Sequence, residues 1–148
     1  MLFRELLLLN PNDNQGIRTL ALEALLKLGR WEEAVRIAEQ YPDDMMAEIL
    51  YGRALALFKL GRRRQATLAL KKAVRYLPGV GDELLKTRHR RPKSTWRGAV
   101  TVGGPDQAYY YWERSGQFWQ SDLGALEWLR NTTRPSTKAR RDKASLLS

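Results

Sequence analysis

The sequence has no cysteine and a single histidine among its 148 residues. Without cysteine, disulfides, thiolate zinc sites and cysteine nucleophiles are excluded. The one histidine, His89, lies in a run of arginines, and nothing in the sequence indicates a partner that would orient its ring for catalysis. No other set of residues has the spacing of a catalytic, metal or phosphate-binding site. We therefore expect a protein that is not an enzyme and has no cofactor.

Long apolar runs are also absent, since none approaches the roughly 20 residues needed to cross a bilayer. The leucine-rich start of the chain is unlike a secretory signal, because Arg4 and Glu5 interrupt it and Pro11 follows it closely. These features predict a cytoplasmic protein that does not associate with membranes.

The positive charge of the chain, +10 at neutral pH, lies in two segments. Residues 86–97 hold six basic residues and no acid, and residues 131–148 hold five basic residues and one acid. The remainder is neutral, but its charges are segregated: residues 32–48 are mainly acidic, and residues 59–75 hold seven basic residues and no acid. The composition predicts a dipolar body with two basic appendages, and not a uniformly basic protein.

Two heptapeptides of the same form, LGRWEEA and LGRRRQA, begin at Leu28 and Leu60. An apolar pattern of helical spacing precedes and follows each of them. The glycine of each heptapeptide ends a helix, because glycine adopts a left-handed backbone conformation without a Cβ penalty. Since the chain turns back within a few residues, the two helices must be antiparallel neighbours. The pattern predicts an all-α protein with two helical hairpins over residues 14–80.

Residues 47–80 resemble the tetratricopeptide repeat, a helix-turn-helix unit of 34 residues. The resemblance rests on large apolar residues, on two small residues where helices approach closely, and on a final proline. These residues are Leu50, Ala54, Leu57, Ala66, Leu70, Ala73 and Pro78. The resemblance implies an α-solenoid fragment built from antiparallel helix pairs.

Residues 15–46 match the same repeat less fully, because Arg18 stands where a large apolar residue is usual. The matching residues are Leu22, Leu25, Ala34, Ala38 and Tyr41. Three motifs, LNPNDNQGIR, YPDD and GALEWLR, are similar to the C-terminal half of a group of bacterial tetratricopeptide-repeat proteins, over about residues 5–130. That similarity implies no biochemical function. A generic helical bundle remains the alternative fold.

Residues 1–13 resemble the second helix of a preceding repeat whose first helix is missing. Aligning Pro11 with the repeat's proline places Phe3 at a position that is usually large and apolar. A helix that is apolar on most sides needs neighbours on both flanks, and an uncovered flank is sticky. We predict self-association, or docking onto upstream repeats, through Leu2, Phe3, Leu6 and Leu9.

Residues 81–104 form a basic connector in which only one helical turn, over residues 82–86, is expected. Charge repulsion and Pro92 oppose regular structure in its middle. The polar and basic tail, residues 131–148, is expected to be disordered.

Two helices are predicted within residues 105–130. Pro105 and Asp106 favour the start of a helix that runs to about residue 120, and Asp122 caps a second, shorter helix. The pair suits the role of a C-terminal cap over the last repeat, whose outer apolar face would otherwise meet water.

The resemblance implies a concave groove lined by the first helix of each repeat. Its candidate residues are Thr19, Glu23, Leu26, Lys27, Tyr51, Leu55, Phe58 and Lys59. The asparagine and lysine set with which other members clamp a peptide carboxylate is missing, because Thr19, Glu23 and Gly52 occupy key positions. Such a groove favours an amphipathic helix or an extended apolar segment of a partner protein. Alternatively, these residues pack beneath the C-terminal helices. We predict a non-catalytic scaffold for protein–protein interaction.

The alternative function is weak, non-specific association with nucleic acid through the basic segments. Its candidate residues are Arg88, Arg90, Arg91, Lys93 and Arg97. Aromatic residues of the neighbouring stretch YYYWERSGQFW would stack on bases. Helical spacing places Tyr111, Trp112 and Trp119 toward the repeats, which leaves Tyr109 and Tyr110 for an exposed role. A solvated connector that binds nothing is the other interpretation of the basic run.

Overall fold

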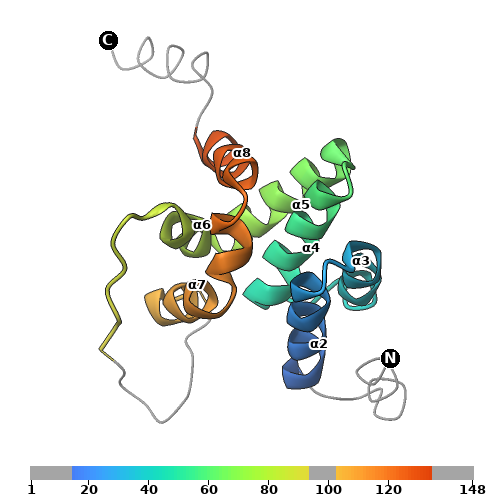
Figure 1. The fold of residues 1–148 in the computed structure, drawn as a ribbon. Helices are drawn as coiled ribbons and strands as arrows, with labels where there is room; N and C mark the ends of the chain where they lie inside the picture. Colours follow the sequence, from blue (N-terminus) through green and yellow to red (C-terminus); the bar gives the residue numbers. More distant parts are fainter. Residues whose placement is uncertain (1–14, 94–102, 135–148) are drawn as a thin grey trace.

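The computed structural model describes residues 15–93 and 103–134, and this part of the chain is all-α, which confirms the predicted fold class (Figure 1). The helices keep the labels of Figure 1, which start at α2. They are α2 (Gln15–Lys27), α3 (Trp31–Glu39), α4 (Ala47–Lys59), α5 (Arg63–Tyr76), α6 (Pro78–Leu85), α7 (Pro105–Gln120) and α8 (Leu123–Thr133). Among the described helices, none combines the length and the apolar character that a membrane span requires.

Helices α2 and α3, and likewise α4 and α5, form two hairpins with the same turn. Gly29 and Gly61 have φ angles of +72° and +78°, in the left-handed region that the sequence predicted for them. In the first turn the Arg30 amide donates a hydrogen bond to the Leu25 carbonyl at 2.9 Å, and the equivalent bond of the second turn is 3.0 Å long. This bond satisfies a carbonyl at the helix end. The shared turn explains why the motif LGR occurs twice.

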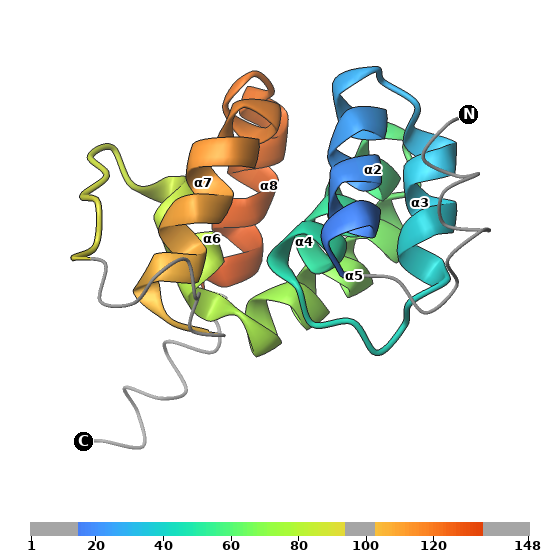
Figure 2. The same ribbon diagram turned by 90° about the horizontal axis from the view of Figure 1, so that it is seen from below.

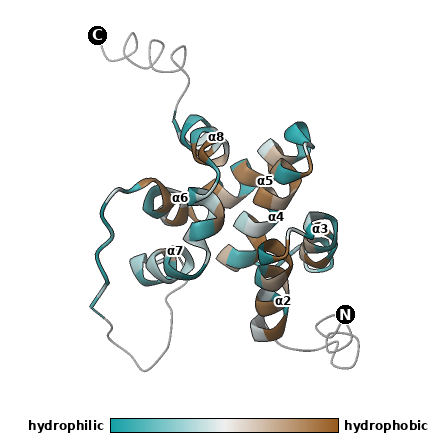
Figure 3. Cartoon of the chain, viewed as in Figure 1, coloured by the Kyte–Doolittle hydropathy of each residue, from teal (hydrophilic) through white to brown (hydrophobic). Residues whose placement is uncertain are grey.

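The core of the hairpins includes apolar positions at which the two sequence repeats match the same pattern. All of the following are buried: Leu22, Leu25, Ala34, Ala38, Leu50, Ala54, Leu57, Ala66, Leu70 and Ala73. Hydrophobic residues are prominent along α2 and α4 (Figure 3), and the buried cluster also includes one side of α5, which packs against α4. Burial of this apolar surface is the main term that stabilises the packed helices.

Arg18 departs from the repeat pattern, and the structure gives the reason. Its Nε lies 2.6 Å from the Oδ2 of Asp44, a carboxylate that is almost wholly buried in the loop before α4. The guanidinium also lies 4.3 Å from the centre of the Tyr41 ring. An ion pair and a cation–π contact therefore replace apolar packing at this position.

Helix α6 is longer than the single turn predicted over residues 82–86, and it crosses the predicted boundary at residue 80. It begins at Pro78, directly after α5, with Leu77 as the shared end residue. The Tyr51 hydroxyl donates a hydrogen bond to the Leu77 carbonyl at 2.6 Å and accepts one from the Gly81 amide at 3.1 Å. These bonds from α4 satisfy backbone groups of both helix ends. The tertiary contact thus overrides the low helix propensity of a glycine-rich segment.

Helices α7 and α8 begin where the sequence predicted. Pro105 is the first residue of α7, and the Asp122 carboxylate accepts a hydrogen bond from the Ala125 amide at the start of α8, at 3.1 Å. Helix α8 continues to Thr133, beyond the predicted end at residue 130. Its last turn is held in part by the Thr132 hydroxyl, which donates to the Trp128 carbonyl at 2.7 Å.

The C-terminal helices pack on the side of the hairpins that α2 and α4 form (Figures 1 and 2). Helix α7 lies against α6, α4 and α2, while α8 lies against α5, α6 and α7. The contact of α8 with α5 agrees with the predicted role of a cap. Helix α7 does more than cap the last hairpin, because it extends across α4 to α2 and covers the face predicted as a groove.

Several predictions concern residues outside the described ranges. These are the truncated repeat over residues 1–13, the self-association candidates Leu2, Phe3, Leu6 and Leu9, the basic residue Arg97, and the tail from residue 135 onward.

Candidate functional site

The residues predicted to line a groove lie largely beneath α7 and α8. Tyr51 and Leu55 have no exposed surface, and Phe58 is 7% exposed. Thr19 is buried as well, whereas Lys27 at the end of α2 is exposed. The face formed by α2 and α4, which we call the α2–α4 face, is therefore occupied by helices of the same chain.

Aromatic side chains of α7 fill the centre of the α2–α4 face. The Tyr51 ring centre lies 5.8 Å from that of Tyr111 and 6.3 Å from that of Trp119. The Trp119 indole Nε1 donates to the Tyr111 hydroxyl at 3.0 Å, and both side chains are buried, as their helical spacing predicted. Burial raises the pKa of the Tyr51 and Tyr111 hydroxyls well above their usual range, so both stay neutral.

Helix α8 covers the other end of the face through Trp128. The Trp128 and Phe58 rings are stacked, with centres 4.5 Å apart and planes inclined by 23°. The Trp128 Nε1 also donates to the Thr67 hydroxyl of α5 at 3.1 Å. A stacked aromatic pair of this kind contributes about 0.5–1.5 kcal/mol beyond its buried area.

Ion pairs at the rim fix the orientation of the two C-terminal helices. Lys59 Nζ lies 2.6 Å from Asp122 Oδ2, and this hydrogen bond lowers the pKa of the Asp122 carboxyl. On α2, Glu23 accepts from Arg114 at 3.1 Å and from the buried Ser115 hydroxyl at 3.4 Å. Two of the predicted groove residues, Glu23 and Lys59, therefore bind the chain's own C-terminal helices.

Glu48, at the start of α4, has an unusual environment that sequence reasoning missed. Its Oε2 atom is buried and has no hydrogen-bond partner within the described part of the chain. Burial is the main factor that raises the pKa of the Glu48 carboxyl, and the negative charges of Glu23 and Asp44 add to the effect. Across residues 15–93 and 103–134, no group of three or more histidine, cysteine, aspartate or glutamate side chains is placed to hold a metal ion. Glu48 therefore has an altered acidity, and the described residues around it do not form a metal-binding group.

His89 has the partners that the sequence did not indicate. Its Nδ1 lies 3.1 Å from Oε1 of Glu83 on α6, and its ring is stacked on the Trp112 indole of α7, with centres 3.5 Å apart. Lys86 binds the other oxygen of Glu83 at 2.7 Å. The contact joins residues 83, 89 and 112, whose spacing follows no helical period, which explains why sequence patterns missed it.

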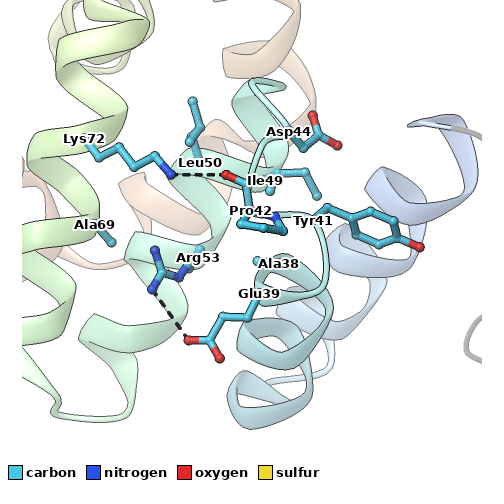
Figure 4. Close-up of a pocket in the computed structure, with 10 residues that line it drawn as sticks. All are labelled: Ala38, Glu39, Tyr41, Pro42, Asp44, Ile49, Leu50, Arg53, Ala69 and Lys72. Atoms are coloured by element: carbon cyan, nitrogen blue, oxygen red, sulfur yellow. Dashed lines mark hydrogen bonds and ion pairs between the residues drawn. The ribbon is translucent and has the colours of Figure 1, made fainter.

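A hollow of about 470 Å³, open to solvent, lies between α3, α4 and α5 (Figure 4). Arg53 approaches Glu39 at 3.6 Å, and the Lys72 ammonium donates to the Pro42 carbonyl at 3.3 Å. The walls between these polar groups are apolar and include Ile49. Charges of both signs line the hollow, and they form no constellation of nucleophile, base and orienting group.

Comparisons with protein-family models, with curated proteins and with solved structures gave no match. The described features define an all-α protein of helical hairpins, in which a C-terminal helix pair occupies the α2–α4 face.

Proposed function

We propose that this chain is a non-catalytic protein-interaction module of the tetratricopeptide-repeat type, whose α2–α4 face binds an amphipathic helix of a partner protein. The observation that carries the proposal is that this face already holds helices, with Tyr51 packed against Tyr111 of α7 and Phe58 against Trp128 of α8. A helix binds a groove by laying its apolar face on such side chains. The proposal includes a cytoplasmic location, with which the lack of cysteine is consistent.

A partner helix would compete with α7 and α8 for the same side chains. Because these helices belong to the same chain, their docking is intramolecular, with an effective concentration on the order of 1 mM. If the helix pair, as a separate peptide, bound the face with a Kd of about 10 μM, the chain's own helices would occupy the face about 99% of the time. The apparent affinity of a partner helix for the face would then fall about 100-fold. Binding of a partner is therefore controlled by the strength of the internal contacts.

A labelled peptide tests the proposal directly. The probe is a fluorescein-labelled peptide of residues 103–134, and the full-length chain carries Asp122→Ala and Trp128→Ala, which weaken internal docking. We expect the peptide to bind this variant at least about tenfold more tightly than it binds the unaltered chain. The matched control is Leu123→Ala with Glu127→Ala, two exposed positions of the same helix, which should leave peptide binding unchanged.

Charge reversal shows whether the peptide occupies the face in the same way as the internal helices. Adding Lys59→Glu to the weakened chain should reduce peptide affinity about three- to tenfold, since it opposes Asp122 of the peptide. A peptide with Asp122→Lys should restore affinity for that variant. Circular dichroism of each variant reports whether the chain remains folded. Failure of the folded, weakened chain to bind the peptide, or indifference to both charge changes, would contradict the proposal.

A further inference from the structure

The basic segment after α6 is anchored to α7 through His89. Its side chain is 7% exposed, held between the Glu83 carboxylate at 3.1 Å and the Trp112 indole. Glu83 is itself buried, and both of its oxygens are engaged, one by His89 and the other by Lys86. A buried carboxylate with two charge-assisted contacts and a stacked ring fixes the chain at this point.

The anchor fixes the position of a cluster of cations. Arg88 and Arg90 flank the stacked His89 in the chain, and Arg91 and Lys93 follow. All four cationic side chains are exposed. Because the backbone at residue 89 is already held, less conformational entropy is lost when these cations bind a ligand.

Two tyrosines of α7 lie beside the same anchor. The Tyr109 ring centre is 5.6 Å from that of Trp112 and 5.7 Å from that of Tyr110. Tyr109 and Tyr110 are partly exposed, in contrast to the buried Tyr111, whose ring points toward α4. Consecutive residues of α7 thus serve two surfaces, the α2–α4 face and the aromatic edge next to the anchored cations.

We propose that this second surface binds single-stranded nucleic acid without sequence preference. We call it the connector surface, and its members are Arg88, Arg90, Arg91, Lys93, Tyr109 and Tyr110. Cations that follow a phosphate backbone, next to aromatic rings on which unpaired bases stack, are the recurring features of such sites. The anchored His89 joins the two halves, since it lies within the cationic segment and its ring is stacked on Trp112 of the helix that carries the tyrosines.

The arrangement favours a single-stranded nucleic acid over an anionic membrane. Insertion among lipids needs exposed apolar side chains beside the cations. The large apolar side chains that are exposed in the described ranges belong to α2, α5 and α8 or to the turn after α2, and they are Leu20, Leu28, Leu68, Tyr76 and Leu123. The connector surface offers aromatic rings with polar ends, which suit stacking on bases.

The test measures binding of the full-length chain to a fluorescein-labelled oligouridylate of about 20 nucleotides, by anisotropy at several salt concentrations. Four phosphate contacts predict a slope of log affinity against log salt of about −3. The test variant replaces Arg88, Arg90 and Arg91 with glutamine. It should reduce the magnitude of the slope by about 2 and weaken binding at least tenfold at low salt.

A second triple variant controls for net charge. It replaces three exposed cations of α5 with glutamine, at Arg64, Lys71 and Arg75, and so removes the same charge from another helix. We expect this control to bind the oligouridylate within about twofold of the unaltered chain. Equal weakening by the two triple variants would overturn the proposal, because binding would then reflect overall charge alone.

The stacking half of the surface is tested by Tyr109→Leu and Tyr110→Leu, which keep an apolar side chain but remove the ring. Each should weaken oligouridylate binding about fivefold or more with an unchanged salt slope. Glu113→Gln, which removes an exposed acid one turn further along α7, should strengthen binding about twofold. The proposal would be overturned if neither tyrosine mattered, if a duplex of the same length bound equally well, or if phosphatidylglycerol vesicles bound while the oligouridylate did not.

Discussion

Tyr51→Phe is the substitution whose effect the structure defines most sharply. It removes one oxygen atom from a side chain with no exposed surface and leaves the ring in place. That oxygen donates to the Leu77 carbonyl at 2.6 Å and accepts from the Gly81 amide at 3.1 Å. The change therefore isolates the link between α4 and the junction of α5 with α6.

The expected loss follows from what remains after the oxygen is removed. The Gly81 amide, in a buried residue, loses the partner described for it, which costs about 1–3 kcal/mol. The Leu77 carbonyl keeps a bond from the Val80 amide at 3.2 Å, so its loss is smaller, at about 0.5–1 kcal/mol. Together these terms predict a decrease of about 1.5–4 kcal/mol in the free energy of unfolding, a large share of the 5–15 kcal/mol typical of a domain.

Urea unfolding followed by tryptophan fluorescence measures this decrease, and Tyr76→Phe is the matched control. Tyr76 is 50% exposed, so its substitution should change the free energy of unfolding by less than about 0.5 kcal/mol. In hydrogen-exchange measurements, the Gly81 amide should exchange faster in Tyr51→Phe than in the unaltered chain, and Tyr76→Phe should leave its exchange unchanged. The reasoning is refuted if Tyr51→Phe is as stable as the control and the Gly81 amide keeps its protection.

Three further predictions concern the core, a buried acid and the anchored connector. Because both side chains are buried, Leu57→Ala should lower the free energy of unfolding by about 2–5 kcal/mol through a cavity, and Ala66→Leu by about 1–3 kcal/mol through overpacking. If neither substitution changed the urea unfolding curve, the helix packing described above would be contradicted. Glu48 has a pKa raised above its unfolded value, so its ionisation opposes folding as pH rises through the folded pKa. Glu48→Gln should accordingly stabilise the chain at pH 7, on the order of 1 kcal/mol, and the gain should shrink toward pH 4; a gain that is independent of pH would argue against this cause. His89→Ala should release the basic segment and speed limited trypsin cleavage at residues 88–91 several-fold, whereas an unchanged rate would mean that the stacked ring holds nothing in place.

The hairpins could be predicted from sequence because their determinants are local. The glycines of the two LGR motifs fix the turns, and helical spacing of apolar residues identifies the buried faces. Helix α6 was predicted too short for the opposite reason. Its glycine-rich sequence has little intrinsic helix propensity, and the hydroxyl of Tyr51, far away in the sequence, stabilises its start.

The candidate site shows the same division between local and long-range determinants. The positions of Tyr51, Leu55 and Phe58 on one face followed from the resemblance to a repeat. All three residues are buried, Tyr51 against a ring of α7 and Phe58 against a ring of α8. What covers them was left open between a partner and the chain's own helices. The chain's own helices cover them, through contacts such as the one between Lys59 and Asp122, which are 63 residues apart. No local sequence pattern predicts a contact over that separation.

The anchoring of the basic connector was missed because its parts are individually unremarkable in the sequence. A lone histidine within arginines, a glutamate at the end of a short helix and a tryptophan among tyrosines each have ordinary interpretations. Only their meeting, with His89 stacked on Trp112 and bonded to Glu83, gives the segment a fixed position.

The most direct test of helix exchange on the α2–α4 face places the photo-crosslinker p-benzoylphenylalanine at position 58, where the Phe58 ring lies 4.5 Å from that of Trp128. Irradiation of the chain alone should give an intramolecular adduct that mass spectrometry maps to residues 123–129 of α8. An excess of a separate peptide of residues 103–134 should reduce this adduct and produce a chain–peptide adduct in its place, as expected for a helix-binding face. An adduct elsewhere in the chain, or an intramolecular adduct that the peptide leaves unchanged at every concentration, would contradict the claim that the α2–α4 face binds helices in exchange for its own.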